Sequence, residues 1–308
     1  MKTVKIHFLN TIWSDVSILE VDNHYGMIDT GSSFYFPMIQ EYLKENNINH
    51  LDFVFLSHFH SDHYGNMINV LTNYKVDKVY FRNYSRHEAI SGDGSITDEE
   101  YINNQIKIEE EIKECVIKHS TKLVIIDESL EYIELNGLKL YLFNQLDIVN
   151  YLYNKEDSLF YQKNTLSENH MTIPLYFEYL NHHVYFGGDL TDNDSKEQLV
   201  RYQNLRVLLN IKKRFNFDHL DIYKTTHHGG GGSNNPATFI LTKPDYAIIT
   251  NTNRWLDNWS TRSNILLGSP SCNICQTDYY QYVFDLSNKQ ITCRYIPKES
   301  LFITLNKD

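Results

Sequence analysis

Four residues of types that bind metal ions lie within six positions of one another, in the segment His58-Phe59-His60-Ser61-Asp62-His63. The apolar run 53–56 precedes this segment and a polar turn follows it, so it is expected to join the end of a buried strand to the start of a helix. Because side chains of an extended chain repeat every second residue, His58 and His60 point to the same side. Asp62 and His63, at the start of the helix, can face the same cavity. Imidazole and carboxylate groups suit divalent ions such as zinc, so the segment predicts a metal site.

Three other apolar runs also end in possible metal ligands. Asp29 follows the run 26–28, Asp189 follows the run 184–188, and His227-His228 follow the run 220–224. Glycines beside each of them allow the backbone to approach an ion closely. A carboxylate at a strand end beside two glycines, such as Asp189, is well placed to bridge two ions. Asp29 either caps a turn or orients a histidine without touching the metal, and the second role is favoured.

The paired histidines have different predicted roles. Adjacent residues of an extended strand point in opposite directions, so one ion is not expected to bind both. We predict that His228 binds metal and that His227 faces the substrate, with the reverse assignment left open. His170 lies in the segment Ser167-Glu168-Asn169-His170, just before an expected strand, and is either a further metal ligand or a polar residue of a loop.

Hydrophobic periodicity and turn residues predict an α/β fold in which two βα halves contribute two sheets between outer helices, a four-layer αββα sandwich. The chain is expected to form a single domain over residues 1–308, with insertions at about 95–119, which has a helical repeat, and 144–168, which has no clear period. The other expected helices are 36–45, 63–73, 194–203 and one that begins near Pro236. The expected strands are 3–9, 16–21, 25–29, 51–56, 79–81, 122–126, 131–135, 138–143, 171–179, 183–187, 219–225, 244–250, 279–285 and 291–296.

Composition and charge restrict the possible partners. The 308 residues are 42% hydrophobic, which is enough for a large core. The net charge of −11, from 39 acidic and 28 basic residues, disfavours a protein that coats nucleic acid or an anionic membrane, although a local basic groove is not excluded. The sequence contains no apolar run long enough to span a membrane and no signal-peptide pattern, so a cytoplasmic location is expected.

The chain has four cysteines, Cys115, Cys272, Cys275 and Cys293. Cys272 and Cys275 form a C-x-x-C pattern, but no second pair or nearby histidine pair completes the four ligands of a structural zinc site. Reduced, unpaired thiols are therefore predicted, with a redox-active pair as the second interpretation.

The motif and the strand-end residues resemble those of the metallo-β-lactamase-fold hydrolases. The H-x-H-x-D-H motif of that superfamily matches His58 to His63 without a gap, its strand-end aspartates match Asp29 and Asp189, and its late histidine falls at 227–228. The resemblance covers about residues 4–250. It is stronger to the branch that holds bacterial phosphorylcholine esterase and the hydrolase domain of the DNA-uptake protein ComEC, because of the segment Asn169-x-x-Thr172 and the paired histidines followed by glycine.

The resemblance implies a site with two zinc ions. His58, His60 and Asp189 would hold one ion, and Asp62, His63, Asp189 and His228 would hold the other. Manganese or iron could fill the same ligands. In that branch the Asn-x-x-Ser/Thr segment commonly supplies no ligand, so His170, which lies inside it, is a departure from the pattern. Substrate choice is expected to depend on residues 95–119, 144–168 and 251–308, where the resemblance ends.

The predicted function is a zinc-dependent hydrolase that cleaves a phosphodiester or another phosphoryl ester of a small or surface-attached molecule with a metal-bound hydroxide. Asp62, Asp189 and His227 are the predicted catalytic residues, and His227 would donate a hydrogen bond or a proton to the reacting group. The alternatives are a nuclease of the same fold, a lactonase or β-lactamase-type hydrolase, and a metal-bound interaction module without catalytic activity.

Overall fold

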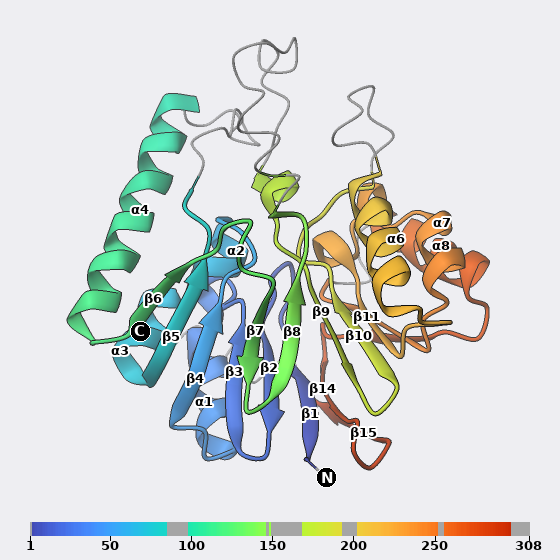
Figure 1. Cartoon of the computed structure of the whole chain (residues 1–308), viewed down its shortest axis with the longest axis horizontal. Coiled ribbons are helices and arrows are strands. Elements are labelled where there is room, and N and C mark those ends of the chain that lie inside the picture. Colours follow the sequence, from blue (N-terminus) through green and yellow to red (C-terminus); the bar gives the residue numbers. More distant parts are fainter. Residues whose placement is uncertain are drawn as a thin grey trace.

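The chain folds around two sheets that lie face to face in a computed structural model, which describes residues 2–84, 98–145, 148, 168–192, 202–251 and 256–296 (Figure 1). The first sheet has the strand order β15 (Gln290–Tyr295), β14 (Tyr280–Asp285), β1 (Val4–Phe8), β2 (Ser17–Val21), β3 (His24–Ile28), β4 (His50–Phe55), β5 (Lys75–Phe81) and β6 (Lys122–Ile125). The second sheet has the order β13 (Asn273–Gln276), β12 (Tyr246–Ile249), β11 (Ile222–Lys224), β10 (His182–Phe186), β9 (Leu175–Tyr179), β8 (Leu138–Leu142) and β7 (Tyr132–Leu135).

Each sheet contains a run of parallel strands. Strands β3 to β6 pair in parallel in the first sheet, and strands β10 to β13 pair in parallel in the second. The carboxyl ends of parallel strands meet at one edge of a sheet, which is the usual place for a functional site in α/β proteins. The residues that follow β3, β4, β10 and β11 are therefore brought together from both halves of the chain.

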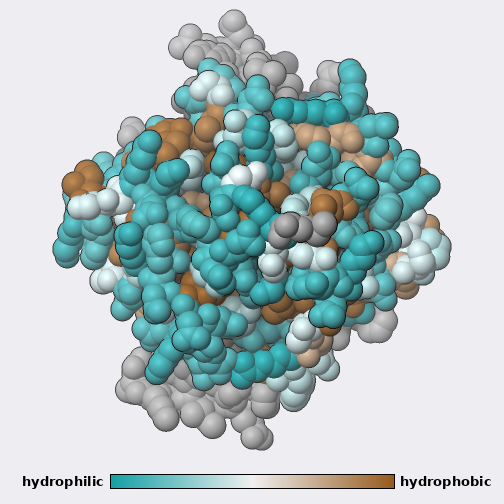
Figure 2. Space-filling model, turned by 60° about the horizontal axis from the view of Figure 1, so that its bottom comes forward, coloured by the Kyte–Doolittle hydropathy of each residue, from teal (hydrophilic) through white to brown (hydrophobic). Residues whose placement is uncertain are grey.

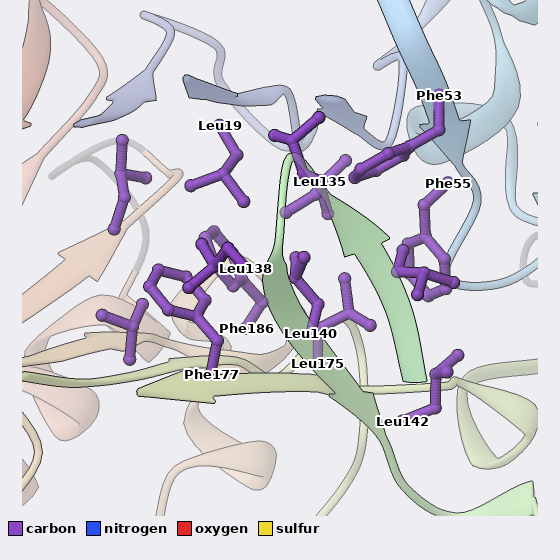
Figure 3. Packing of buried hydrophobic residues seen from close by; sticks show 14 of the residues in the cluster. Leu19, Phe53, Phe55, Leu135, Leu138, Leu140, Leu142, Leu175, Phe177 and Phe186 are labelled. Carbon is purple, nitrogen blue, oxygen red and sulfur yellow. The ribbon is translucent and has the colours of Figure 1, made fainter. Parts of the chain in front are cut away.

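Apolar side chains fill the space between the two sheets. Figure 3 shows Phe53 and Phe55 of β4 directed toward Leu140 of β8, with Phe177 of β9 and Phe186 of β10 in the same layer. All five side chains are at most 4% exposed. Every second residue of these strands points into the layer, so the alternating apolar pattern of the sequence forms the central core.

Helices cover the outer face of each sheet. The helices α1 (Phe36–Glu45), α3 (Met67–Asn73) and α4 (Asp98–Lys118) pack on the first sheet, and α6 (Gln203–Phe215), α7 (Pro236–Thr242) and α8 (Leu256–Gly268) pack on the second (Figure 1). The predicted four-layer αββα sandwich is therefore confirmed. The segment 95–119, expected to be an insertion, contains α4, which connects the parallel strands β5 and β6.

The single helix predicted over residues 63–73 is wrong, because two short helices occupy this region. The helix α2 (Ser61–Tyr64) ends before Asn66, and α3 begins after it. The buried amide nitrogen of Asn66 donates hydrogen bonds to the carbonyl oxygens of Thr30, at 2.9 Å, and Ser32, at 2.6 Å. These bonds fasten the chain to the loop after β3 and interrupt the helix.

Most of the predicted helix over 194–203 lies outside the described residues. The helix α6 begins at Gln203, directly after Tyr202 in a left-handed conformation (φ 49°). The helix α8 and the strand β13 were not predicted, and residues 168–171 form a 3₁₀ turn, η3 (Glu168–Met171), rather than the start of a strand. Most of the predicted insertion 144–168 lies outside the described residues.

The cysteines are reduced and unpaired, as predicted. Cys272 packs in the layer between the second sheet and its helices, whereas Cys275 on β13 packs between the two sheets. Burial raises the pKa of each of these two thiols to about 12, which keeps them protonated. The C-x-x-C pattern therefore belongs to the hydrophobic core.

The face shown in Figure 2 is largely hydrophilic, with apolar side chains in small scattered groups. Single exposed apolar residues of this kind are normal on a protein surface. Among the described helices, none combines the length and the apolar character that a membrane span requires.

Candidate metal centre

The motif segment follows β4 and continues into α2, at the carboxyl end of the parallel strands. Phe59 is fully buried in the outer core, where its ring lies 5.4 Å from that of Phe81. His58 and His60 point the other way, and the His58 Nε2 and His60 Nδ1 atoms are 3.0 Å apart. The alternation of apolar and polar residues in the motif thus anchors the loop on one side and presents two imidazoles on the other.

Two groups of potential metal ligands meet at this edge. Each residue offers one ligand atom, and within a group all of these atoms lie within 4.8 Å of one another. The first group consists of His58, His60 and Asp189. The second group consists of Asp15, His63, Asp189 and His228. Asp189 is common to both groups, and it follows β10 in the second half of the chain.

Asp189 lies between three imidazoles that come from different segments. Its Oδ2 atom is 3.7 Å from His58 Nε2 and 3.6 Å from His228 Nε2, and its Oδ1 atom is 3.2 Å from His63 Nε2. The φ of Gly188 is +50°, and a Cβ atom at this position would lie 2.4 Å from a methyl carbon of Thr172. Glycine is required there, because a larger residue would push the strand end away and displace Asp189.

Asp62 lies at the more open side of the cluster. Its Oδ2 atom is 2.9 Å from His228 Nε2 and 4.0 Å from His63 Nε2, and its side chain is 30% exposed. By contrast, the side chains of His63, Asp189 and His228 are at most 1% exposed. The cluster therefore opens toward solvent on the side of Asp62.

Two buried atoms at the centre of the cluster have no hydrogen-bond partner, His63 Nε2 and Asp189 Oδ1. A buried polar atom without a partner costs free energy, and such atoms are rare in folded proteins. Both atoms belong to ligand types that bind zinc, and they face each other across 3.2 Å. The residues present therefore fit a divalent cation.

Electrostatics support the same conclusion. Burial opposes the ionised form of Asp189, but the imidazoles around it, first His228 and then His63, hold its pKa well below the ordinary value. Burial likewise opposes a charged His63 ring, but the carboxylates of Asp189, Asp29 and Asp62 outweigh burial and raise the pKa of His63 well above the ordinary value. The carboxylates thus favour positive charge on the neighbouring imidazoles. A bound cation would displace the protons of these imidazoles and supply the positive charge in their place.

Asp29 lies behind His63, away from Asp189. The Asp29 Oδ2 atom is 2.8 Å from His63 Nδ1 and accepts a hydrogen bond from the Ser57 hydroxyl at 2.8 Å. The Oδ1 atom accepts a hydrogen bond from the backbone N–H of Ser57 at 2.7 Å. Asp29 has a left-handed φ of 56° directly after β3, which turns its side chain toward the loop that follows β4. This is the geometry of a carboxylate that orients a metal-binding histidine through its second nitrogen.

The change Asp29→Asn is expected to weaken zinc binding by about 10- to 100-fold, because the amide holds the His63 ring less firmly than a carboxylate. Chelator-competition titration of the purified variant against the wild type measures this loss. The change Asp52→Asn is a matched control, because Asp52 makes comparable bonds to His24 and to the Tyr25 backbone outside the cluster. Equal zinc affinity in Asp29→Asn and wild type would contradict the assigned role of Asp29.

The paired histidines are not on an extended strand, contrary to the geometry that the sequence analysis assumed. They lie in a 3₁₀ segment, η4 (Thr226–Gly229), and both have left-handed backbones, with φ of 48° at His227 and 55° at His228. His228 is buried inside the cluster. His227 is half-buried, and its Nδ1 atom is 3.4 Å from the hydroxyl of Ser233. Of the two, the structure brings only His228 into a ligand group, and the assignment of roles stays a prediction.

His170 belongs to neither ligand group of the described residues. Its carbonyl oxygen accepts hydrogen bonds from the side-chain amides of Asn144, at 3.2 Å, and Gln203, at 2.8 Å. Its role as a metal ligand therefore stays a prediction that the geometry of the groups does not favour.

Sequence reasoning missed Asp15 and Lys224 at this site. Asp15 precedes β2, and no pattern in the sequence marks it as part of the site. Asp15 is buried, and it contacts His228 and Lys224 from more than 200 positions away in the chain. No local spacing signals such contacts. The one available sign was a lysine, Lys224, inside an otherwise apolar strand.

Comparisons with known proteins agree with this architecture. Residues 14–127 match the sequence model of the Metallo-beta-lactamase superfamily. The metallo-beta-lactamase fold protein YhfI from Bacillus subtilis is similar to the chain in structure, with a TM-score of 0.55 and 11% identity over 92% of this chain and 99% of that one. A search among curated protein sequences gave no significant match.

Two further solved structures are similar at a lower level. A diphosphatase from the PhnP family has a TM-score of 0.47 and 12% identity, over 89% of this chain and 94% of that one. MEM-A1, a subclass B3 metallo-beta-lactamase isolated from a soil metagenome library, has a TM-score of 0.41 and 12% identity, over 72% of this chain and 76% of that one. The superfamily match, the likeness to YhfI and the four layers together show that the chain has the metallo-β-lactamase fold.

Proposed function

We propose that the protein is a hydrolase that uses two divalent metal ions to cleave a phosphodiester or another phosphoryl ester. The observation that carries the proposal is the position of Asp189, whose two carboxylate oxygens reach donors of both ligand groups. A carboxylate shared between two groups of donors is the arrangement that a two-ion hydrolytic site requires. Zinc is the proposed metal because imidazole and carboxylate ligands suit it, and manganese or iron would use the same donors.

The proposed division of ligands assigns one ion to His58, His60 and Asp189. The second ion would be held by Asp62, His63, Asp189 and His228. When bound, the ions would supply a nucleophilic hydroxide near neutral pH and would offset negative charge on the reacting ester. The donors come from both halves of the chain, and the buried ones exclude bulk water from the inner side of the cluster.

His227 is proposed to contact the substrate. Its ring lies next to that of His228, with ring centroids 6.1 Å apart, but it remains half-buried at the edge of the cluster. Burial lowers the pKa of His227 below the ordinary value, so the ring is neutral near pH 7 and keeps one N–H. That N–H would donate a hydrogen bond to an oxygen of the substrate or of the leaving group.

A phosphoryl ester is the proposed substrate class, by the resemblance to the phosphorylcholine esterase branch. The segment Asn169-x-x-Thr172, which carries part of this resemblance, packs against the strand end that bears Asp189, since Thr172 contacts Gly188. The side-chain oxygens Asn169 Oδ1 and Thr172 Oγ1 are buried without a hydrogen-bond partner. The net charge of −11 favours a small or surface-attached ester over nucleic acid.

Metal content and turnover together test the proposal. Zinc should be measured per chain after metal-replete purification, and turnover should be assayed with bis-p-nitrophenyl phosphate, p-nitrophenyl phosphorylcholine, single-stranded DNA and a lactone. We expect two zinc ions per chain and turnover of one or both phosphoryl esters. Less than one zinc ion per chain would contradict the two-ion site. Full occupancy without turnover of any substrate would instead favour an interaction module without catalytic activity.

A further inference from the structure

A buried network of charged and polar side chains contacts the Nδ1 atom of His228. The Asp15 carboxylate accepts hydrogen bonds from three donors, namely Thr250 Oγ1 at 2.6 Å, His228 Nδ1 at 3.0 Å and the ammonium group of Lys224. All four side chains are at most 6% exposed. The network therefore connects the loop before β2 with the carboxyl ends of β11 and β12.

Asp15 belongs to the second ligand group, but three of the about four acceptor positions of its carboxylate already receive hydrogen bonds. One oxygen accepts from His228 and Thr250, and the other accepts from Lys224. Lys224 also donates to the carbonyl oxygen of Thr225 at 2.9 Å, which fixes the ammonium group beside the carboxylate. A carboxylate that is neutralised by a buried lysine and already accepts three hydrogen bonds acts here as a hydrogen-bond acceptor rather than a ligand.

The hydrogen bond to Nδ1 determines which nitrogen of His228 is presented to the site. A ring held through Nδ1–H directs the lone pair of Nε2 to the opposite side. On that side Nε2 lies 2.9 Å from Asp62 and 3.6 Å from Asp189. Asp29 and His63 have the same relationship, because Asp29 contacts His63 Nδ1 and Asp189 lies near His63 Nε2.

The loop that carries Asp15 also holds the helix that carries Asp62. The backbone N–H of Asp15 and the hydroxyl of Ser14 both donate to the carbonyl oxygen of Asp62, at 3.2 Å and 3.0 Å. The same loop is attached to the second half of the chain by a hydrogen bond from the Trp13 backbone to the carbonyl of Thr250, at 2.9 Å. This three-residue loop thus fixes the separation between Asp62 and His228.

We propose that Asp15, neutralised by Lys224, is a positioning residue that orients His228 for the second metal ion. The proposal rests on the two-ion function given above. The Nδ1–H···Asp15 hydrogen bond would hold the His228 ring in place and leave Nε2 as the ligand atom. Asp15 does not touch the ion. Its loss should weaken the binding of one of the two ions and leave the binding of the other unchanged.

Paired substitutions separate this role from simple charge neutralisation. Removal of Asp15 alone would leave Lys224 buried and unpaired and could unfold the protein, whereas removal of both charges together is tolerated better. In the double variant Asp15→Ala/Lys224→Met we expect one of the two zinc ions to bind about 10- to 100-fold more weakly and the other to bind unchanged. In Asp15→Asn/Lys224→Met the amide oxygen can still accept from His228, although less strongly than a carboxylate, so the loss of zinc affinity should be clearly smaller than in Asp15→Ala/Lys224→Met. Chelator-competition titration, with circular dichroism as the test of folding, measures both.

Wild-type affinity for both ions in the Asp15→Ala/Lys224→Met variant would overturn the proposal. A second measurement needs no variant, because nitrogen-15 NMR of the zinc-loaded wild type reports which nitrogen of His228 carries the proton. A proton on Nδ1 supports the proposal, and a proton on Nε2 overturns it. If the wild type itself held less than one zinc ion per chain, the proposed function would be contradicted, and with it any role of Asp15 at a second ion.

Discussion

Replacement of Asp189 by alanine is expected to abolish hydrolytic activity and to reduce zinc content from two ions per chain to one or none. Asp189 is within 3.7 Å of imidazoles of both ligand groups, so its loss removes a donor from each ion at once. The loss of activity should exceed the about 10- to 100-fold effect expected when a residue that only orients a ligand is changed. Steady-state kinetics and metal analysis of the purified variant measure the two effects.

Asp192 offers a matched control for this experiment. It is a buried aspartate three positions after Asp189, and it accepts hydrogen bonds from Thr238, Asn204 and the backbone of Leu205 rather than facing the cluster. The change Asp192→Asn should lower the melting temperature while zinc content stays at the wild-type level. Near-normal activity of Asp189→Ala would refute the bridging role of this residue.

Replacement of Glu168 by alanine is expected to destabilise the fold by about 3–5 kcal/mol, because it leaves the buried guanidinium of Arg82 without its counter-charge. Glu168 forms an ion pair with Arg82, and its Oε1 atom also accepts a hydrogen bond from the backbone N–H of Phe59 at 3.0 Å. Both side chains of the pair are at most 6% exposed. Urea denaturation of the metal-free protein measures the change in the free energy of unfolding.

The exposed ion pair between Arg214 and Glu131 is the control for Glu168. Its charged atoms are 3.1 Å apart, but the two side chains are 44% and 66% exposed. The change Glu131→Ala should therefore alter the free energy of unfolding by less than about 1 kcal/mol. If Glu168→Ala were as mild as Glu131→Ala, the buried pair would not anchor the loop that carries His58 and His60.

Local patterns in the sequence were sufficient to predict the layers and to single out the residues of the two ligand groups except Asp15. The motif at 58–63 was recognisable from its spacing alone. Side chains alternate along an extended chain, so His58 and His60 lie on the same side independently of the rest of the fold. Asp29 and Asp189 were recognisable because short apolar runs and glycines mark strand ends. Parallel strands bring such ends to one edge of each sheet, so the prediction of several strand ends with ligand residues implied that these residues lie close together.

Contacts between distant segments could not be predicted in this way. The ion pair of Asp15 and Lys224 joins residues 209 positions apart, and it depends on how the two sheets are placed against each other. The left-handed backbone at His227 and His228 was missed because histidine does not by itself signal such a conformation. The helix α6 was not predicted: it shares only Gln203 with the expected helix 194–203, most of which lies outside the described residues.

The first sheet has an order that follows from no local pattern. Strand β1 pairs on one side with β2, its neighbour in the chain, and on the other side with β14, which is made of residues 280–285. During synthesis the β14-facing edge of β1 therefore stays without its partner until nearly the whole described chain has left the ribosome. An unpaired strand edge can pair with another molecule, so this edge is the place where newly made chains are most exposed to aggregation.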